Sequence, residues 1–236
     1  MKIMQTFLGA VATIGLIGVG MSSAYAATIN FDQEQSRASG DLSYSGGNTA
    51  LTGNDITFSY VSGDGVSRLN CQGCLLNFTT GGFSDRIDTG GGNAIYLFNS
   101  GGTFELKGTV VDGSGTTLVD NGTILSGQFV GTQSFTRQGD SSGTFNGNGS
   151  NSVDDSLASY FGIAPGSEYM FISTDFSSEM LTFENGGFNG DLTAADLQTT
   201  SQQAVPEPGE MGVFGLGLAL MMVGLAYRRK NGSNLG

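Results

Sequence analysis

The sequence predicts a mainly β fold, namely an antiparallel β-sandwich, jelly-roll or barrel-like domain with one short helix, followed by a C-terminal transmembrane helix. Apolar and polar residues alternate along several short segments. Glycine, asparagine and serine separate these segments about every ten residues. The chain also contains 40 glycines, which disfavour long helices. Short strands at such a spacing are typical of sandwiches and barrels.

Period-two alternation locates the predicted strands. In Ile56–Tyr60 large apolar residues alternate with small polar ones. The segment Thr103–Val110 places Phe104, Leu106 and Val110 on one face. The same pattern predicts further strands at Ile124–Val130, Tyr169–Ser173 and Met180–Phe183.

Turns and loops are predicted where Gly pairs with Asp or Asn. Such pairs occur in Ser62–Gly65, Asp112–Gly115 and Asp120–Gly122, and they favour tight hairpin turns. The polar stretch Arg137–Ser152 is expected to form a long surface loop. Within it, Thr144–Asn146 is a candidate edge strand.

One helix is predicted near residue 155. Ser152 is its expected N-cap, and Asp154 and Asp155 occupy the first turn, where the helix dipole favours acidic side chains. Gly162 is expected to end the helix. A second helical turn is predicted at Ala194–Leu197. The residues of the first helix that would face the core are Leu157, Tyr160 and Phe161.

Charge and composition exclude several functions. Residues 27–205 carry five basic and 19 acidic side chains, a net charge of −14. Nucleic acids and anionic membrane surfaces require a basic surface, so neither is expected as a partner. The chain contains no histidine, which excludes a Ser-His-Asp triad and histidine metal sites built from this chain alone. We therefore predict a protein that is not an enzyme and has no cofactor. The sequence identifies no metal site, and it leaves open whether any metal binds.

The N-terminal segment resembles a secretory signal peptide of 26 residues. A basic second residue precedes the apolar stretch Phe7–Gly20, which is too short to span a bilayer. The small residues Ala24 and Ala26 suit signal peptidase, which would leave Ala27 as the first mature residue. The alternative is an uncleaved N-terminal anchor.

The C-terminal segment predicts a membrane anchor. Met211–Tyr227 is an uncharged apolar stretch of 17 residues, which at about 1.5 Å per residue is at the short end of what spans a bilayer. A basic cluster follows directly, so residues 228–236 are expected to remain cytoplasmic. This cluster consists of Arg228, Arg229 and Lys230.

A stiff segment of two prolines and one glutamate precedes the anchor, namely Pro206, Glu207 and Pro208. Together with the apolar helix and the basic cluster, it resembles the PEP-CTERM sorting signal. This resemblance implies processing by exosortase, a membrane cysteine protease, and a final place in the bacterial envelope or an exopolysaccharide matrix. Residues 27–198 would then be the exported β-rich domain and residues 199–210 a linker. The tail of six residues after the basic cluster is longer than the signal usually has, and a plain single-pass anchor is the alternative.

Two groups of residues in the domain suggest chemistry. Cys71 and Cys74 are expected to form a disulfide in an exported protein, with a redox-active CxxC as the alternative. The segment Gly139–Gly143 matches the G-x-S-x-G pattern of serine hydrolases, but without histidine it is interpreted as a turn.

Acidic and tyrosine side chains leave a carbohydrate-related function open. A glycosidase needs two carboxylates on either side of a sugar. Any of the 19 acidic residues might qualify, so the sequence selects no glycosidase pair. The pattern of a calcium loop is absent, but Asp85 with Asp88, or Asp112 with Asp120, could still meet in space and hold calcium. The tyrosines able to stack on sugars are Tyr44, Tyr60, Tyr96, Tyr160 and Tyr169. We predict an exported protein with a structural or adhesive role, plausibly in an exopolysaccharide or biofilm matrix. The alternatives are a carbohydrate-binding module and a carboxylate-based glycoside hydrolase or lyase.

Overall fold

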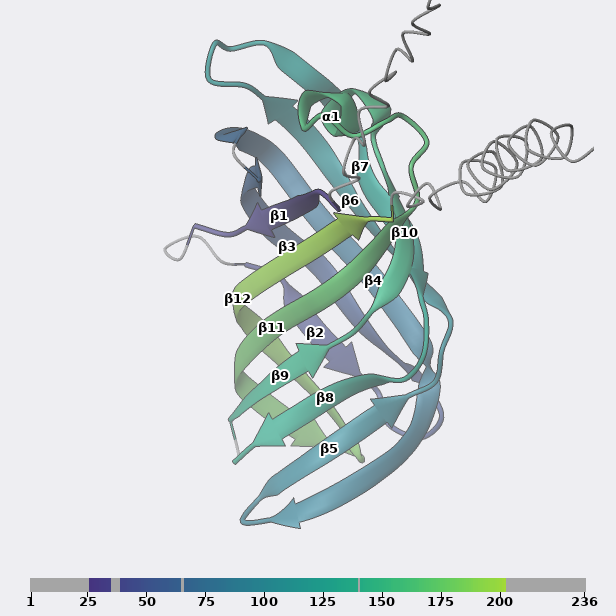
Figure 1. The fold of residues 1–236 in the computed structure, drawn as a ribbon. Helices are drawn as coiled ribbons and strands as arrows, with labels where there is room; N and C mark the ends of the chain where they lie inside the picture. Colours follow the sequence, from purple (N-terminus) through teal and green to yellow (C-terminus); the bar gives the residue numbers. More distant parts are fainter. Residues whose placement is uncertain (1–25, 35–38, 65, 140, 203–236) are drawn as a thin grey trace, which may run out of the picture.

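The computed structural model in Figure 1 describes residues 26–34, 39–64, 66–139 and 141–202, and these residues form an antiparallel β structure with one short helix. The mainly β prediction is therefore confirmed. The strands are β1 (Thr28–Asp32), β2 (Asp41–Tyr44), β3 (Ala50–Gly63), β4 (Val66–Gly90), β5 (Asn93–Phe98), β6 (Gly102–Val111), β7 (Thr117–Phe129), β8 (Gln133–Gln138), β9 (Ser142–Asn146), β10 (Gly149–Val153), β11 (Tyr169–Glu184) and β12 (Gly187–Ser201), and the helix is α1 (Asp155–Tyr160).

The strands form one sheet that closes on itself. Strands β1 and β2 pair with β3, β3 pairs with β4, and β9 and β10 pair with β11. Both β5 and β6 pair with β4, and they lie end to end along it. The next turns of the chain repeat this arrangement, with β7 and β8 against β6 and β5, then β10 and β9 against β7 and β8. Finally β12 pairs with both β11 and β1. The sheet is therefore closed, which is consistent with the barrel-like arrangement among those expected.

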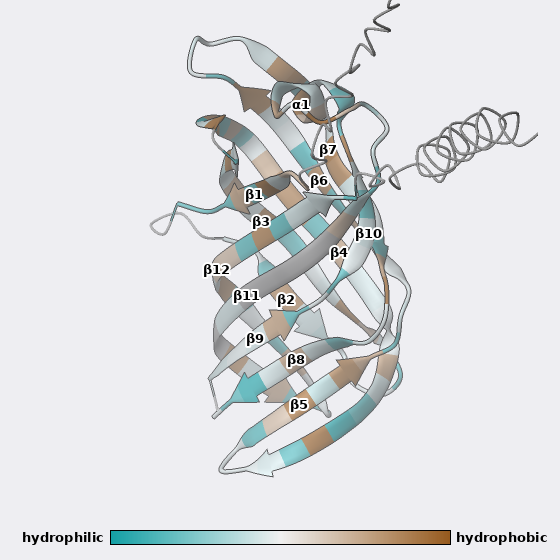
Figure 2. Cartoon of the chain, in the orientation of Figure 1, coloured by the Kyte–Doolittle hydropathy of each residue, from teal (hydrophilic) through white to brown (hydrophobic). Residues whose placement is uncertain are grey.

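Apolar side chains of the alternating strands fill the space inside the closed sheet. Figure 2 shows hydrophobic bands alternating with hydrophilic ones along the strands. On β6, Phe104, Leu106 and Val110 are buried, as predicted, while Thr103 and Lys107 are exposed. Closed sheets of about eight strands leave an interior that side chains can just fill. The buried apolar residues accordingly form one core cluster.

Several strand glycines lie directly beneath aromatic rings of neighbouring strands. A Cβ atom added to Gly53 would overlap the ring of Phe78, and one added to Gly143 would overlap the ring of Phe135. The backbone of each glycine therefore forms one wall of an aromatic pocket. This packing explains why the chain places glycine inside strands, where it is otherwise unfavourable.

The helix α1 begins two residues later than predicted. Its N-cap is Asp154, whose carboxylate accepts hydrogen bonds from the backbone N–H groups of Ser156 at 2.9 Å and Leu157 at 3.2 Å. Ser152, the expected N-cap, lies in β10 opposite Ser126 of β7. Strand β10 therefore includes Ser152, where the sequence suggested that the helix would begin. Gly162 follows the helix with a φ of +74°, as expected for a residue that ends a helix.

Removing the Asp154 carboxylate should destabilise the domain. We expect Asp154→Ala to lower the free energy of unfolding by about 1 kcal/mol, the usual cost of a lost N-cap. Asp154→Asn keeps an acceptor oxygen and should retain most of the stability. Urea unfolding followed by circular dichroism measures both variants, and an equal loss in both would contradict the capping role.

Two predicted loops are strands in the structure. The stretch Arg137–Ser152 contains β9 and β10, and β9 is not an edge strand because it pairs with β8 on one side and β11 on the other. Its polar residues alternate with Gly143 and Phe145, which are buried. The segment Asp120–Gly122 is an irregularity within β7 rather than a turn, with Asn121 at a φ of +43°. Asn-Gly tolerates positive φ both in a hairpin turn and in an irregular strand, so this dipeptide does not distinguish between the two.

The end of the domain also differs from the prediction. Ala194–Leu197 belongs to β12 and is not helical. The strand continues to Ser201, so residues 199–201 are part of the domain and not of the predicted linker. Thr199 is 0% exposed and Ser201 is 2% exposed. Pairing with both β1 and β11 explains this burial.

Candidate functional site

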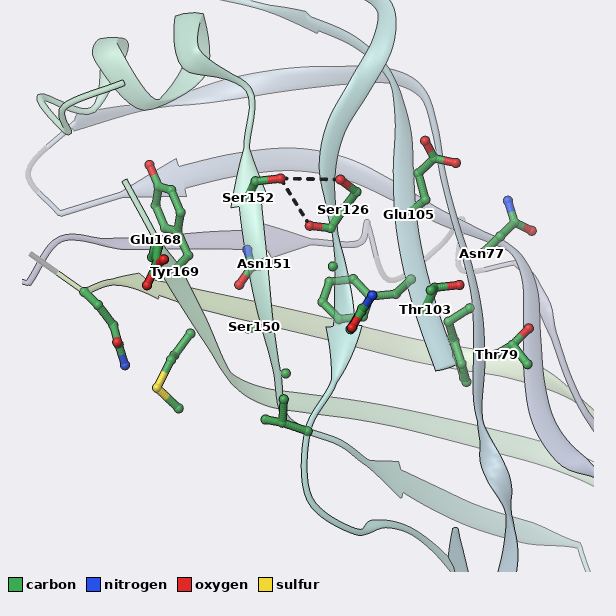
Figure 3. Close-up of a pocket in the computed structure, with 18 of the residues that line it drawn as sticks. Asn77, Thr79, Thr103, Glu105, Ser126, Ser150, Asn151, Ser152, Glu168 and Tyr169 are labelled. Atoms are coloured by element: carbon green, nitrogen blue, oxygen red, sulfur yellow. Dashed lines mark hydrogen bonds between the residues drawn. The ribbon is translucent and has the colours of Figure 1, made fainter. Parts of the chain in front are cut away.

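A cleft of about 1080 Å³ crosses the face of the sheet formed by β4, β6, β7, β10 and β11. It runs across the strands, and Figure 3 shows side chains from neighbouring strands along it. Strand neighbours lie about 4.8 Å apart, so side chains at matching register positions form rows across the sheet. We call this cleft the groove.

Two rows of polar side chains line the groove, and we call them the ladders. The first contains Asn77, Glu105, Ser126 and Ser152, and the second contains Thr79, Thr103, Gln128 and Ser150. All eight residues are exposed or half-buried. The hydroxyl of Ser152 lies 3.5 Å from that of Ser126 (Figure 3). The groove therefore presents hydroxyl and amide groups at a regular spacing.

Backbone and an aromatic ring form the floor between the ladders. A Cβ atom on Gly127 would overlap the Phe104 ring and the carbonyl oxygen of Ser150, and one on Gly149 would overlap the carbonyl oxygen of Gln128. These two glycines therefore allow the neighbouring backbone and the buried Phe104 ring to approach closely beneath the ladders. Close backbone approach of this kind is a common role of glycine in strands.

Two glutamates line the groove. Glu105 accepts hydrogen bonds from Lys107 Nζ at 2.8 Å and from the Thr123 hydroxyl at 2.8 Å. The bond from Lys107 is the main cause that lowers the pKa of Glu105, and the Thr123 bond adds to it. Glu168 precedes β11 and is exposed. No basic residue lines the groove among the described residues.

Two buried polar side chains border the groove from inside the sheet. Asn151 is 9% exposed, and its Oδ1 accepts a hydrogen bond from the Thr199 hydroxyl at 3.0 Å, whereas its Nδ2 has no hydrogen-bond partner among the described residues. The Tyr169 hydroxyl likewise has none there. Burial, with a smaller contribution from Asp155, raises the pKa of Tyr169 to about 12.

Removing the unpartnered Tyr169 hydroxyl should stabilise the domain. A buried hydroxyl without a partner costs about 1 kcal/mol or more, so Tyr169→Phe should raise the free energy of unfolding by about that amount at neutral pH. Tyr44→Phe is the matched control, because its hydroxyl donates to the Gly47 carbonyl at 2.6 Å and its loss should destabilise. Equal effects in urea unfolding would contradict this interpretation.

Tyr169→Phe should also change the stability of the domain in alkali. The Tyr169 pKa rises from 10.0 to about 12 in the folded state, so the contribution of this group is present below pH 10 and is lost as the pH rises through 12. Near pH 11 the loss is about 1 kcal/mol after allowance for solvent screening. Tyr169→Phe should lack this part of the alkaline destabilisation.

The predicted cysteine pair is found in β4. Cys71 and Cys74 form a disulfide, and Cys74 is 1% exposed. The pairing of β4 with β6 shifts register between Gln72 and Leu75, so the disulfide spans a bulge. A redox-active CxxC requires a helix that begins at the cysteine pair. The chain instead continues as strand β4 after Cys74, so this requirement is not met.

The aspartates of the pairs named from sequence form local interactions. Asp112 accepts hydrogen bonds from the backbone N–H groups of Ser114 and Thr116 within its own turn, and the Ser114 side-chain bond is the main cause that lowers its pKa. Asp88 pairs with Arg86. Neither candidate pair lines the groove.

The candidate tyrosines do not form a sugar-stacking platform. Tyr44, Tyr96 and Tyr169 are at most 3% exposed. The Arg68 guanidinium covers the ring of half-buried Tyr60 at 3.2 Å, and Tyr160 is half-buried. The G-x-S-x-G segment lies at the hairpin between β8 and β9, which agrees with its interpretation as a turn.

The predicted mature N-terminus lies at the start of the fold. The Ala27 N–H donates to the Ser201 hydroxyl at 3.0 Å, and its carbonyl accepts from the Ser201 N–H at 2.9 Å. Ala26 is exposed. Ala24 and the whole tail lie outside the described residues, including the proline motif (Pro206, Glu207, Pro208), the membrane segment Met211–Tyr227 and the basic cluster (Arg228, Arg229, Lys230). Among the described residues, none of the helices has the length and apolar character needed to cross a bilayer.

Comparison with protein-family models, curated proteins and solved structures finds no match. The geometry of the groove is therefore the main indication of function. Sequence reasoning missed the ladders, because each polar residue looked like an ordinary solvent-facing position. The sequence shows only that polar residues occupy the outward-facing positions of β4, β6, β7 and β10. Which of these residues lie opposite one another is known from the strand register in the structure.

Proposed function

We propose that this chain is an exported, non-catalytic protein of the bacterial envelope or an exopolysaccharide matrix, and that its groove binds polysaccharide. Its role would be structural or adhesive. Signal peptidase, and then exosortase acting on the C-terminal tail, would process the chain during export. The protein would be held in the inner membrane by residues 211–227 during transit and then reach the cell surface or the extracellular matrix.

The two ladders carry this proposal. A polysaccharide offers hydroxyl groups along its whole length, and the ladders offer hydroxyl and amide groups across neighbouring strands. Their repeat of about 4.8 Å is comparable to the length of one sugar ring. Many modest hydrogen bonds along a shallow groove suit the retention of a long polymer, because their contributions add along the chain.

A binding role is favoured over hydrolysis by the state of the carboxylates. Hydrolysis needs two carboxylates that face one sugar from opposite sides. In the groove, Glu105 is already engaged by Lys107 and Thr123. The pairs suggested by sequence lie elsewhere. A general acid would also need a raised pKa, whereas the pKa of Glu105 is lowered.

Removal of ladder hydroxyl groups tests the binding proposal. Thr79 and Thr103 are direct cross-strand neighbours, and the double variant Thr79→Val/Thr103→Val keeps their shape without the hydroxyl groups. We expect at least a tenfold loss of affinity, about 1.4 kcal/mol, for polysaccharide from the producing cells in affinity electrophoresis. Thr136→Val/Thr144→Val is the matched control. These two half-buried threonines lie opposite each other on β8 and β9, outside the groove. Equal losses would defeat the proposal.

The sorting step is tested separately. Replacement of the motif Pro206–Pro208 by three alanines should leave the protein in the inner membrane, measured by cell fractionation and immunoblotting. Pro165→Ala is the control, because Pro165 is the remaining proline of the chain and is exposed in the β domain. Unchanged release of the triple variant would contradict processing at this motif.

A further inference from the structure

We infer that the groove selects uncharged polysaccharides over acidic ones, an inference that rests on the proposed function. Apart from Glu105, the ladders offer neutral hydroxyl and amide groups. The charged groups along the groove are the carboxylates of Glu105 and Glu168. An acidic polymer would therefore bring its carboxylates to a surface on which no cation among the described residues lines the groove.

Two cationic side chains of the described residues stack on aromatic rings outside the groove. The Arg68 guanidinium lies over the Tyr60 ring at 3.2 Å, and that of Arg137 lies over the Phe183 ring at 3.7 Å. Stacked guanidinium groups of this kind lose part of their freedom to reach a ligand.

The other two described cations form ion pairs. Arg86 bonds to Asp88, and Lys107 bonds to Glu105 at 2.8 Å. Lys107 lies on β6 two residues from Glu105 of the first ladder, and its partner is that carboxylate. A polyanion would have to displace that partner and leave Glu105 uncompensated.

The charge of the whole domain acts in the same direction. Five basic against 19 acidic residues in the range 27–205 create a negative potential that repels polyanions within about 8 Å of the surface at physiological salt. Uncharged polymers do not experience this potential. The selectivity therefore comes from repulsion of the wrong ligand as well as from hydrogen bonds to the right one.

A single added cation provides the most direct test. Gln128 lies in the middle of the second ladder and is exposed, so Gln128→Lys places an ammonium group in the groove. Gln138→Lys is the matched control, because Gln138 is an exposed residue at the end of β8, outside the groove. Both variants change the net charge by the same amount, so a difference between them reports the local position.

The experiment measures binding of the full chain in detergent to immobilised dextran and galactomannan, which are uncharged, and to alginate, which carries carboxylates. Each is measured at about 0.02 M and about 0.5 M NaCl, where the screening lengths differ severalfold. We expect an uncharged polymer to bind with little change between the two salt concentrations, and alginate to bind at least about tenfold more weakly at low salt. Gln128→Lys should gain salt-sensitive alginate binding, and Gln138→Lys should not.

The outcomes separate this inference from the proposed function. Alginate bound as tightly as the uncharged polymers by the unaltered chain overturns the selectivity and leaves polysaccharide binding intact. Equal gains in both lysine variants overturn the role of the groove in excluding acidic polymers. Absence of binding to all three polymers overturns the proposed function together with the inference.

Discussion

Gly53→Ala is expected to lower the free energy of unfolding by about 3 kcal/mol, although it adds only one methyl group. The new Cβ would overlap the Phe78 ring. This ring cannot move away freely, because it stacks on the Phe145 ring with centroids 5.0 Å apart and meets the Phe129 ring edge at 5.7 Å. Overpacking of a rigid core typically costs about 1–3 kcal/mol or more.

A second substitution should relieve this strain. Phe78→Leu removes the ring that the methyl group would strike, so Gly53→Ala should cost much less in the Phe78→Leu background than alone. Gly113→Ala is the control, because a Cβ there meets no atom within 4 Å and its effect should be near zero. Thermal unfolding of the four variants forms a double-mutant cycle. Additive effects would contradict direct contact between Gly53 and Phe78.

Loss of the Cys71–Cys74 disulfide is expected to cost about 2 kcal/mol. The double variant Cys71→Ala/Cys74→Ala releases a loop of four residues in the unfolded chain, for which the loop-entropy model gives about this value. The alanines also leave space where Cys74 now packs against Gly108. Because both cysteines are buried, alanine avoids the added cost of burying a hydroxyl group.

A neighbouring substitution provides the control for the disulfide. Gln72 lies inside the same loop and is exposed, so Gln72→Ala should change the unfolding free energy by less than about 0.5 kcal/mol. Mass spectrometry of non-reduced exported protein should find the chain two hydrogens lighter than its reduced form. Free thiols, or a double variant as stable as the unaltered chain, would contradict the structural role.

The parts of the fold that depend on alternation could be predicted from the sequence. Phe104, Leu106 and Val110 alternate with polar residues, and the structure buries all three. The β9–β10 region escaped prediction because its apolar content is low. There Gly143 takes an inward position that a large side chain would normally occupy, and the Phe135 ring of the neighbouring strand fills the space. When a ring from one strand fills the space above a glycine of the next, the sequence of either strand alone does not show it.

The helix and the groove show the same limit. Ser152 and Asp154 are both good N-caps, and the choice between them was decided by the pairing of Ser152 with Ser126 across the sheet. The ladders likewise depend on which residues of four separate strands share a level. Register of this kind is set by the closure of the whole sheet, so local patterns supply the candidates but not the alignment.

The contact between Ala27 and Ser201 has a mechanical consequence. The chain enters and leaves the domain at adjacent points. Opposed forces on the two ends would therefore separate β1 from β12 by breaking their hydrogen bonds one after another. Tension on the C-terminal side alone meets more resistance, because β12 is bonded along one side to β11 and along the other to β1 and β2. A tether attached after Ser201 would therefore bear traction better than one that pulled on both ends.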